Sequence, residues 1–155
     1  SDVCSSDLGI GSATPAAQDA TATAPLPSTG TAAGTPAAPL QQWQDLHAPI
    51  AADWERRPLR VIDHAVGKPS LTRWRALAHD ATAQTTRVEL EPLTGRTHQL
   101  RVHLAAIGHP ILGDALYADA TTQAQAPRLL LHASHLAFAH PGTGEPVALE
   151  WAADF

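Results

Sequence analysis

Residues 93–110 read LTGRTHQLRVHLAAIGHP, and this stretch decides where the principal helix of the fold lies. Its apolar residues Leu100, Leu104 and Ile107 recur at i, i+4 and i+7, which is the spacing of one helical face. Gly108 follows at the position where a glycine commonly ends a helix. The spacing therefore predicts one amphipathic helix that ends next to Gly108.

The start of this predicted helix is basic. Thr97 is the expected N-cap, Arg96 precedes it, and His98, Arg101 and His103 follow within two turns. A helix start favours negative charge, and each adverse charge costs about 0.3–1 kcal/mol. A compensating anion is expected, either a carboxylate from elsewhere in the fold or a bound phosphate. Ordinary structural or surface ion pairs of Arg96 and Arg101 are the alternative.

Segments on both sides of the helix have the alternation of half-buried strands. Residues 71–77 and 86–91 predict one hairpin, and residues 134–139 and 147–151 predict a second. The expected fold class is α+β, a mainly antiparallel mixed sheet with flanking helices.

The front of the chain differs from the rest. The first 55 residues hold no lysine or arginine, whereas the whole chain has 10 of these residues and a formal net charge of −5. Residues 9–40 consist largely of Ala, Thr, Pro, Gly and Ser without a clear apolar period, which is typical of disorder. We expect residues 1–47 to be disordered or non-native and residues 48–155 to form the domain. The sequence contains no methionine, which suggests a fragment or a processed chain.

Several classes of protein are disfavoured. No apolar run approaches the roughly 18 residues needed to span a membrane. Cys4 is the single cysteine, so an internal disulfide is excluded. His98, His103 and His109 lack the i, i+4 spacing of helical metal ligands, and no nucleotide-binding glycine motif is present. We therefore expect no metal site and no loop that cradles a nucleotide. The negative net charge does not suggest a general nucleic-acid binder, although a local arginine cluster can bind phosphate.

The stretch TGRTHQLRVHL at 94–104, continued by IGHPILGD at 107–114, resembles the signature of the RluA family of RNA pseudouridine synthases. Within that family the likeness is to the branch that acts on both ribosomal and transfer RNA. Further matching segments are Asp53-Trp54, Arg57-Pro58, Gly67-Lys68-Pro69, Pro127 to Ala133, His140-Pro141 and Ala152 to Phe155. The resemblance covers roughly residues 48–155.

This resemblance implies the C-terminal half of a pseudouridine synthase catalytic domain, truncated on its N-terminal side. It implies isomerisation of uridine to pseudouridine in structured RNA, in ribosomal or transfer RNA loops, without a cofactor. An aspartate attacks a nucleotide that has been flipped out of its stack. By resemblance, Arg101 is the catalytic partner that keeps this aspartate ionised, and the anion expected beside the helix start is the catalytic aspartate.

The resemblance also implies residues that contact substrate or RNA. Arg96, His98 and Gln99 would touch phosphate or the pocket backbone, with hydrogen bonds that fix the helix start as the alternative. Leu130 and Leu131 would form an apolar wall of the uracil pocket, with ordinary core packing as the alternative. The complete expected set is Arg96, Thr97, His98, Gln99, Leu130 and Leu131, with Arg56, Arg57, Arg73 and Arg75 as weaker phosphate contacts.

The sequence departs from the family pattern at the nucleophile. The family's His-Arg-Leu-Asp stretch followed by Thr-Ser-Gly has no counterpart, and neither does its active-site tyrosine. Tyr117 belongs to a later Gly-Asp-x-x-Tyr motif, and Asp114 is expected to be structural. The chain alone is therefore expected to be inactive. The alternatives are a non-catalytic RNA-binding remnant and an inactive gene fragment. The expected partner is RNA, with no membrane contact, and the expected state is a cytoplasmic monomer.

Overall fold

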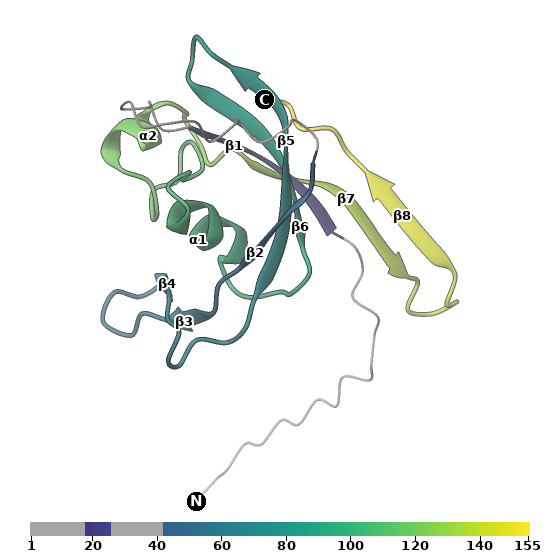
Figure 1. Ribbon diagram of the computed structural model, residues 1–155. Coiled ribbons are helices and arrows are strands. Elements are labelled where there is room, and N and C mark those ends of the chain that lie inside the picture. The colour runs from purple at the N-terminus through teal and green to yellow at the C-terminus, as the bar shows by residue number, and fades with distance from the viewer. Residues whose placement is uncertain (1–17, 26–41) are drawn as a thin grey trace, which may run out of the picture.

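The structure is a computed structural model that describes residues 18–25 and 42–155. Figure 1 shows a large sheet with its helices and a small second sheet on one side of it. The elements are β1 (Gln18–Pro25), β2 (Gln44–His47), β3 (Ile50–Ala52), β4 (Arg60–Ile62), β5 (Leu71–Asp80), β6 (Thr85–Pro92), α1 (Gln99–Ala106), α2 (Ala120–Ala124), β7 (Leu131–Ala139) and β8 (Pro146–Glu150).

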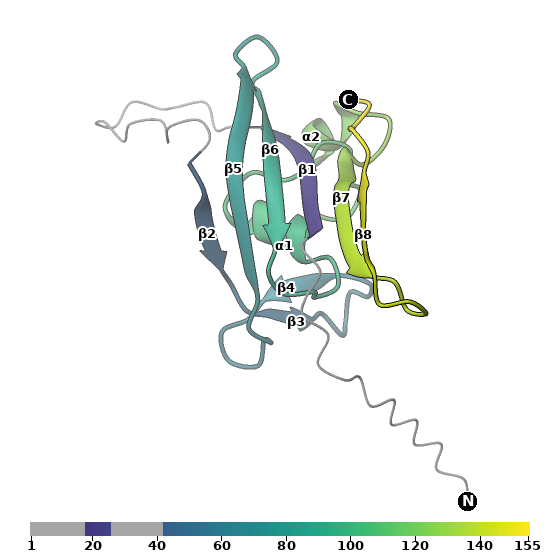
Figure 2. The same cartoon turned by 90° about the vertical axis from the view of Figure 1, so that its right-hand side faces the viewer.

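The large sheet has the strand order β2-β5-β6-β1-β7-β8, and each neighbouring pair is antiparallel (Figure 2). Strands β3 and β4 form a separate antiparallel pair, which an isolated bridge from Ile50 to Lys68 extends. The α+β class expected from the sequence is confirmed. Within the described part of the chain, no helix has the length and apolar character that crossing a membrane requires.

The first predicted hairpin is confirmed as β5 and β6. Thr72 points inward and is buried, whereas the neighbouring arginines pair across the strands. Arg73 lies opposite Glu91 and Arg75 lies opposite Glu89, and each arginine forms an ion pair with its cross-strand partner. Such pairs stabilise a hairpin modestly. The carboxylates also neutralise both arginines, which weakens the expectation that this face binds phosphate.

Strand β1 lies within the segment for which the sequence predicts disorder. It is inserted between β6 and β7, with Ala22 in register with Val88 on one side and with Leu131 on the other. The prediction of disorder does not hold for these residues or for β2; residues 1–17 and 26–41 lie outside the described part. Alternating alanine and threonine is compatible with a strand, and two unpaired edges supply the backbone partners that composition cannot reveal.

Helix α1 lies on one face of the large sheet, and the core forms between them (Figure 1). Val88 and Leu90 of β6 pack with Leu104 of α1 and with Ile111. The predicted helix end is confirmed, because Gly108 follows it with a φ of +84°. The predicted N-cap is wrong. His98 occupies that position with a φ of 58°, and no side chain caps the helix start.

The second predicted hairpin is confirmed as β7 and β8, which form one edge of the large sheet. Strand β7 begins at Leu131, three residues before the predicted start. Leu149 on β8 is 55% exposed and Trp151 just beyond it is 77% exposed, so the apolar face of this edge lies outside the core.

A series of glycine variants tests the backbone geometry around the core. Gly113 has a φ of +73°, and a Cβ there would lie 1.9 Å from the carbonyl oxygen of Arg128. Gly108 also has positive φ but has open space around it. We expect Gly108→Ala to cost about 1 kcal/mol of unfolding free energy. Gly113→Ala should cost at least about 2 kcal/mol, because strain and a backbone clash add. Urea unfolding measures both; equal losses would contradict the packing described.

Candidate functional site

The turn before α1 is held by the side chain of Gln99, which is only 3% exposed. Its Oε1 accepts hydrogen bonds from the Thr94 hydroxyl at 2.8 Å and from the Arg96 backbone N–H at 3.0 Å. Its Nε2 donates to the Leu71 carbonyl at 2.9 Å and to Thr72 Oγ1 at 3.0 Å. All four bonding positions of this amide are therefore used inside the fold. Gln99 fixes the helix start, as the alternative interpretation expects, and offers RNA no polar atom.

Arg101 forms a bidentate ion pair with Asp114, which has no exposed surface. Arg101 Nε donates to Asp114 Oδ2 at 2.8 Å, and Arg101 Nη2 donates to Oδ1 at 2.6 Å. The Leu116 and Tyr117 backbone N–H groups also donate to Oδ1, at 2.8 and 3.1 Å. Asp114 is thus the carboxylate that compensates the basic helix start. The sequence predicts the catalytic aspartate as this anion, and that prediction is corrected: within the described residues, the anion paired with Arg101 is Asp114.

Both members of the Arg101–Asp114 pair are charged. Burial raises the pKa of the Asp114 carboxyl, but the hydrogen bonds from Arg101 and the two backbone N–H groups outweigh it, so its pKa is lowered overall. The hydrogen bond to Asp114 raises the pKa of the Arg101 guanidinium against the effect of burial. The Arg101 side chain as a whole is 16% exposed.

Tyr117 connects Arg101 to the small sheet. Its hydroxyl accepts a hydrogen bond from the Arg60 backbone N–H at 2.9 Å and lies 2.8 Å from His98 Nδ1. The Arg101 guanidinium lies over its ring at 5.0 Å from the centroid. Burial lowers the pKa of His98, with Arg101 and Arg60 acting in the same direction, so His98 is neutral near pH 7. The Tyr117 hydroxyl is therefore held by two partners within the fold.

His103 is fully buried and joins α1 to the end of β2 and the start of β5. Its Nδ1 lies 2.9 Å from Thr72 Oγ1, and its Nε2 lies 2.9 Å from the Ala48 carbonyl oxygen and 3.3 Å from Ser70 Oγ. Burial lowers its pKa. His103 is therefore a structural histidine rather than a metal ligand or a contact to RNA.

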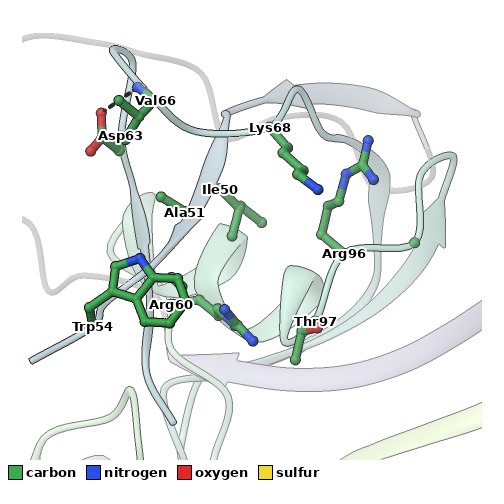
Figure 3. A pocket seen from close by; sticks show the side chains of 11 residues that line it. Ile50, Ala51, Trp54, Arg60, Asp63, Val66, Lys68, Arg96 and Thr97 are labelled. Atoms are coloured by element: carbon green, nitrogen blue, oxygen red, sulfur yellow. Dashed lines mark hydrogen bonds between the residues drawn. The ribbon is translucent and has the colours of Figure 1, made fainter. Parts of the chain in front are cut away.

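A cavity of about 730 Å³ opens between the small sheet and the turn before α1 (Figure 3). Arg96 and Thr97 line it, together with residues that the expected set does not contain. Figure 3 shows Lys68 beside Arg96, with Trp54 and Arg60 on the opposite side of the opening. The cavity is lined by Ile50, Ala51, Ala52, Trp54, Arg60, Asp63, Val66, Lys68, Gly95, Arg96 and Thr97.

The other expected residues lie elsewhere. Leu130 and Leu131 pack against the core, and Leu130 also lines a cavity of about 760 Å³ with Arg87 and Phe155. That cavity shares no residue with the one beside Arg96. The expected set is therefore not one cluster. Whether the two leucines contact a substrate base stays a prediction.

Trp54, Arg60 and Lys68 are the cavity residues that sequence reasoning did not select as a site. Trp54 and Lys68 lie in segments that match the family pattern, and Arg60 follows such a segment. The available sequence signal for this site was a tryptophan that is followed within six residues by several arginines. It could not reveal that the chain between residues 54 and 68 folds back towards the turn at 95–97.

The fold agrees with a match to a described family. The chain belongs to the RNA pseudouridylate synthase family, whose model matches residues 22–106. The α+β arrangement is that of the family.

Curated relatives make the likeness more specific. The chain is 47% identical over 107 residues to the dual-specificity RNA pseudouridine synthase RluA of Escherichia coli strain K12, which covers 69% of this chain and 48% of the relative. It is 52% identical over 101 residues to the protein of the same name from Pasteurella multocida, which covers 65% and 46%. The chain thus spans about half the length of the curated relatives it matches.

Solved structures show the same fold. The human RNA pseudouridylate synthase domain containing 1 matches with a TM-score of 0.68 and 31% identity, over 88% of this chain and 54% of that one. The human RNA pseudouridylate synthase domain containing 4 matches with a TM-score of 0.59 and 22% identity, over 89% and 58%. The second match concerns the fold alone.

A double-mutant cycle tests the buried pair. Asp114→Asn leaves the Arg101 guanidinium without its counter-ion, and Arg101→Met leaves a buried carboxylate unpaired. Each change should lower the unfolding free energy by about 3 kcal/mol, and the double variant by clearly less than the sum. Urea unfolding provides the measurement. The exposed pair of Arg128 and Asp154 is the matched control, and its loss should leave stability nearly unchanged. Additive losses at Arg101 and Asp114 would contradict the coupling.

The buried histidine predicts a pH dependence of stability. Because burial lowers the pKa of His103, the unfolded chain binds a proton more readily than the folded one. The contribution of His103 is fully present above the unfolded value of about 6.5 and is lost as the pH falls through the lower folded value. His103→Gln should therefore show a smaller drop in stability between pH 8 and pH 5.5 than the unaltered chain. The exposed His64→Gln should retain the full drop; equal drops in both variants would count against the assignment.

Proposed function

We propose that this chain forms part of the active site of an RNA pseudouridine synthase and that Arg101 is its catalytic residue. The proposal is carried by the guanidinium of Arg101, which lies within the stretch that the family model matches. The fully buried Asp114 fixes this guanidinium. Relatives named as pseudouridine synthases support the activity. The proposal covers an enzyme of which this chain spans about half.

The donors of Arg101 determine what it can do. A guanidinium carries five N–H donors, and the pair with Asp114 uses one on Nε and one on Nη2. Arg101 Nη1 makes no hydrogen bond within residues 18–25 and 42–155. The side chain can therefore hold a second carboxylate while Asp114 keeps it in position. A guanidinium in hydrogen-bonding contact with a carboxylate keeps that carboxylate ionised even where burial opposes the charge.

The proposed reaction balances without a cofactor. The bond between N1 of uracil and C1′ of the ribose breaks, the base turns, and a bond between C5 and C1′ forms. The hydrogen of C5 leaves to solvent, and N1 gains a proton. An ionised aspartate acts as the nucleophile, and the nucleotide must leave its stack to reach it, at a cost of a few kcal/mol. The contribution of Arg101 is electrostatic: it stabilises the charge of the nucleophile before attack.

The substrate proposed is structured RNA, in ribosomal or transfer RNA loops, where an unpaired base is least costly to extrude. The words "dual-specificity RNA pseudouridine synthase" in the names of the relatives support RNA as the substrate. We further propose that the enzyme acts in the cytoplasm as a monomer. Arg101 and Asp114 come from one chain, so this pair needs no second copy.

A chimera tests the proposal. The N-terminal half of the Escherichia coli relative, joined to residues 42–155 of this chain, should release tritium from transcripts labelled with [5-³H]uridine. Arg101→Ala in the chimera should lower the rate at least about a hundredfold, because it removes a preorganised electrostatic contact. Arg101→Lys should recover part of the loss, since it keeps the charge but not the planar fork.

The unaltered chain of 155 residues is the companion sample, and we expect it to release no tritium. A folded chimera that binds the transcripts but releases no tritium would favour a non-catalytic RNA-binding remnant. Near-normal release by the Arg101→Ala chimera would contradict the role of Arg101.

A further inference from the structure

The cavity beside the small sheet is positively charged. Arg60, Lys68 and Arg96 line it, whereas Asp63 is the single carboxylate among the lining residues. Asp63 Oδ1 accepts hydrogen bonds from the backbone N–H groups of residues 65 and 66, at 2.8 and 3.1 Å. Figure 3 shows this carboxylate on the side of the opening away from Lys68 and Arg96. The cations therefore face the cavity without a paired anion in it.

Two of the three cations, Arg96 and Arg60, differ in how their side chains are bonded. Arg96 Nε donates to the Pro69 carbonyl at 3.3 Å, which ties its guanidinium to the segment that carries Lys68. The Nε of Arg60 is buried and has no hydrogen-bond partner within the described part of the chain. A buried donor without a partner is costly, and native structures usually satisfy it with a ligand or water. Arg60 thus points to an acceptor that enters the cavity from outside.

An aromatic surface borders these cations. Trp54 lines the cavity and is 72% exposed, so its indole is accessible to a stacking partner. The guanidinium of Arg57 lies over its ring at 4.1 Å from the centroid. That contact steadies the indole and covers one of its faces. Within the described residues no ring or cation lies over the other face.

Size and lining restrict the occupant. The cavity of about 730 Å³ lies in the range of small-ligand sites, about 300–1,000 Å³. Its lining includes Ile50, Ala51 and Val66, so it is not polar throughout. A phosphate suits three cations, and a flat base suits an exposed indole. A nucleotide within a single-stranded segment combines both.

We propose that this cavity is a second RNA subsite, which binds a nucleotide flanking the reacting uridine, with its phosphate at Arg60, Lys68 and Arg96 and its base stacked on Trp54. The inference rests on the proposed function, because it takes RNA as the substrate. The subsite is distinct from the Arg101 site but joined to it, since the Arg60 backbone N–H bonds the Tyr117 hydroxyl beneath Arg101. RNA held here would enter the reacting site from the side of the small sheet.

Binding of the full chain to a fluorescein-labelled uridine stem-loop tests the subsite, by anisotropy over a series of KCl concentrations. Lys68→Ala and Arg96→Ala should each weaken binding roughly tenfold at low salt. Each should also lower the slope of log K against log[KCl] by about 0.7, because one phosphate contact to a single strand is lost. Trp54→Ala should weaken binding about fivefold or more with an unchanged slope, and Trp54→Phe should retain most of the affinity.

Arg128→Ala is the matched control, because it removes an exposed arginine that lies outside this cavity. It should leave both affinity and slope close to those of the unaltered chain, and thermal melts should show that every variant is folded. If the unaltered chain binds but the three cavity variants all behave like Arg128→Ala, the subsite is overturned and the proposed function stands. If the unaltered chain fails to bind RNA, the subsite is overturned. Tritium release by the chimera reports the proposed function separately.

Discussion

The guanidinium of Arg101 lies against a carboxylate, that of Asp114, which has no contact with solvent. A buried charge is tolerated only when it is paired and hydrogen-bonded, so this contact fixes where α1 sits relative to the segment after Gly113. The same segment carries Tyr117, whose hydroxyl reaches the small sheet through Arg60. The pair therefore locks the helix, the following loop and β4 into one arrangement.

The two surfaces that we propose to be functional follow from that arrangement. On one side of Tyr117 lies the end of the Arg101 guanidinium that the pair with Asp114 does not use, and we propose that the reacting nucleotide lies beside it. On the other side, Arg60 belongs to the cationic cavity with Trp54. Gln99 and His103 contribute by holding the turn and the helix rather than by contacting RNA. In the proposed function, catalysis and RNA positioning thus depend on structural side chains as much as on the cations themselves.

The hairpins and α1 could be predicted because their apolar periods are local properties of the chain. The N-cap could not, since His98 takes that place through its contact with Tyr117, far along the sequence. Strand β1 was missed because its Ala and Thr residues form a strand between neighbours that composition does not reveal. The basic helix start correctly indicated a missing anion. The identity of that anion, Asp114, depended on how the loop after α1 folds back. The cavity depended likewise on the return of the small sheet towards residues 95–97.

The central claim is that Asp114 holds one end of the Arg101 guanidinium and leaves the other end available. Hydrogen exchange of the arginine side chains, followed by ¹H–¹⁵N NMR of the full chain, tests it most directly. The account predicts a protected Arg101 Nε–H whose protection disappears in Asp114→Asn, together with rapid exchange at Nη1. An Arg101 Nε–H that exchanges as fast as that of an exposed arginine in the unaltered chain would contradict it.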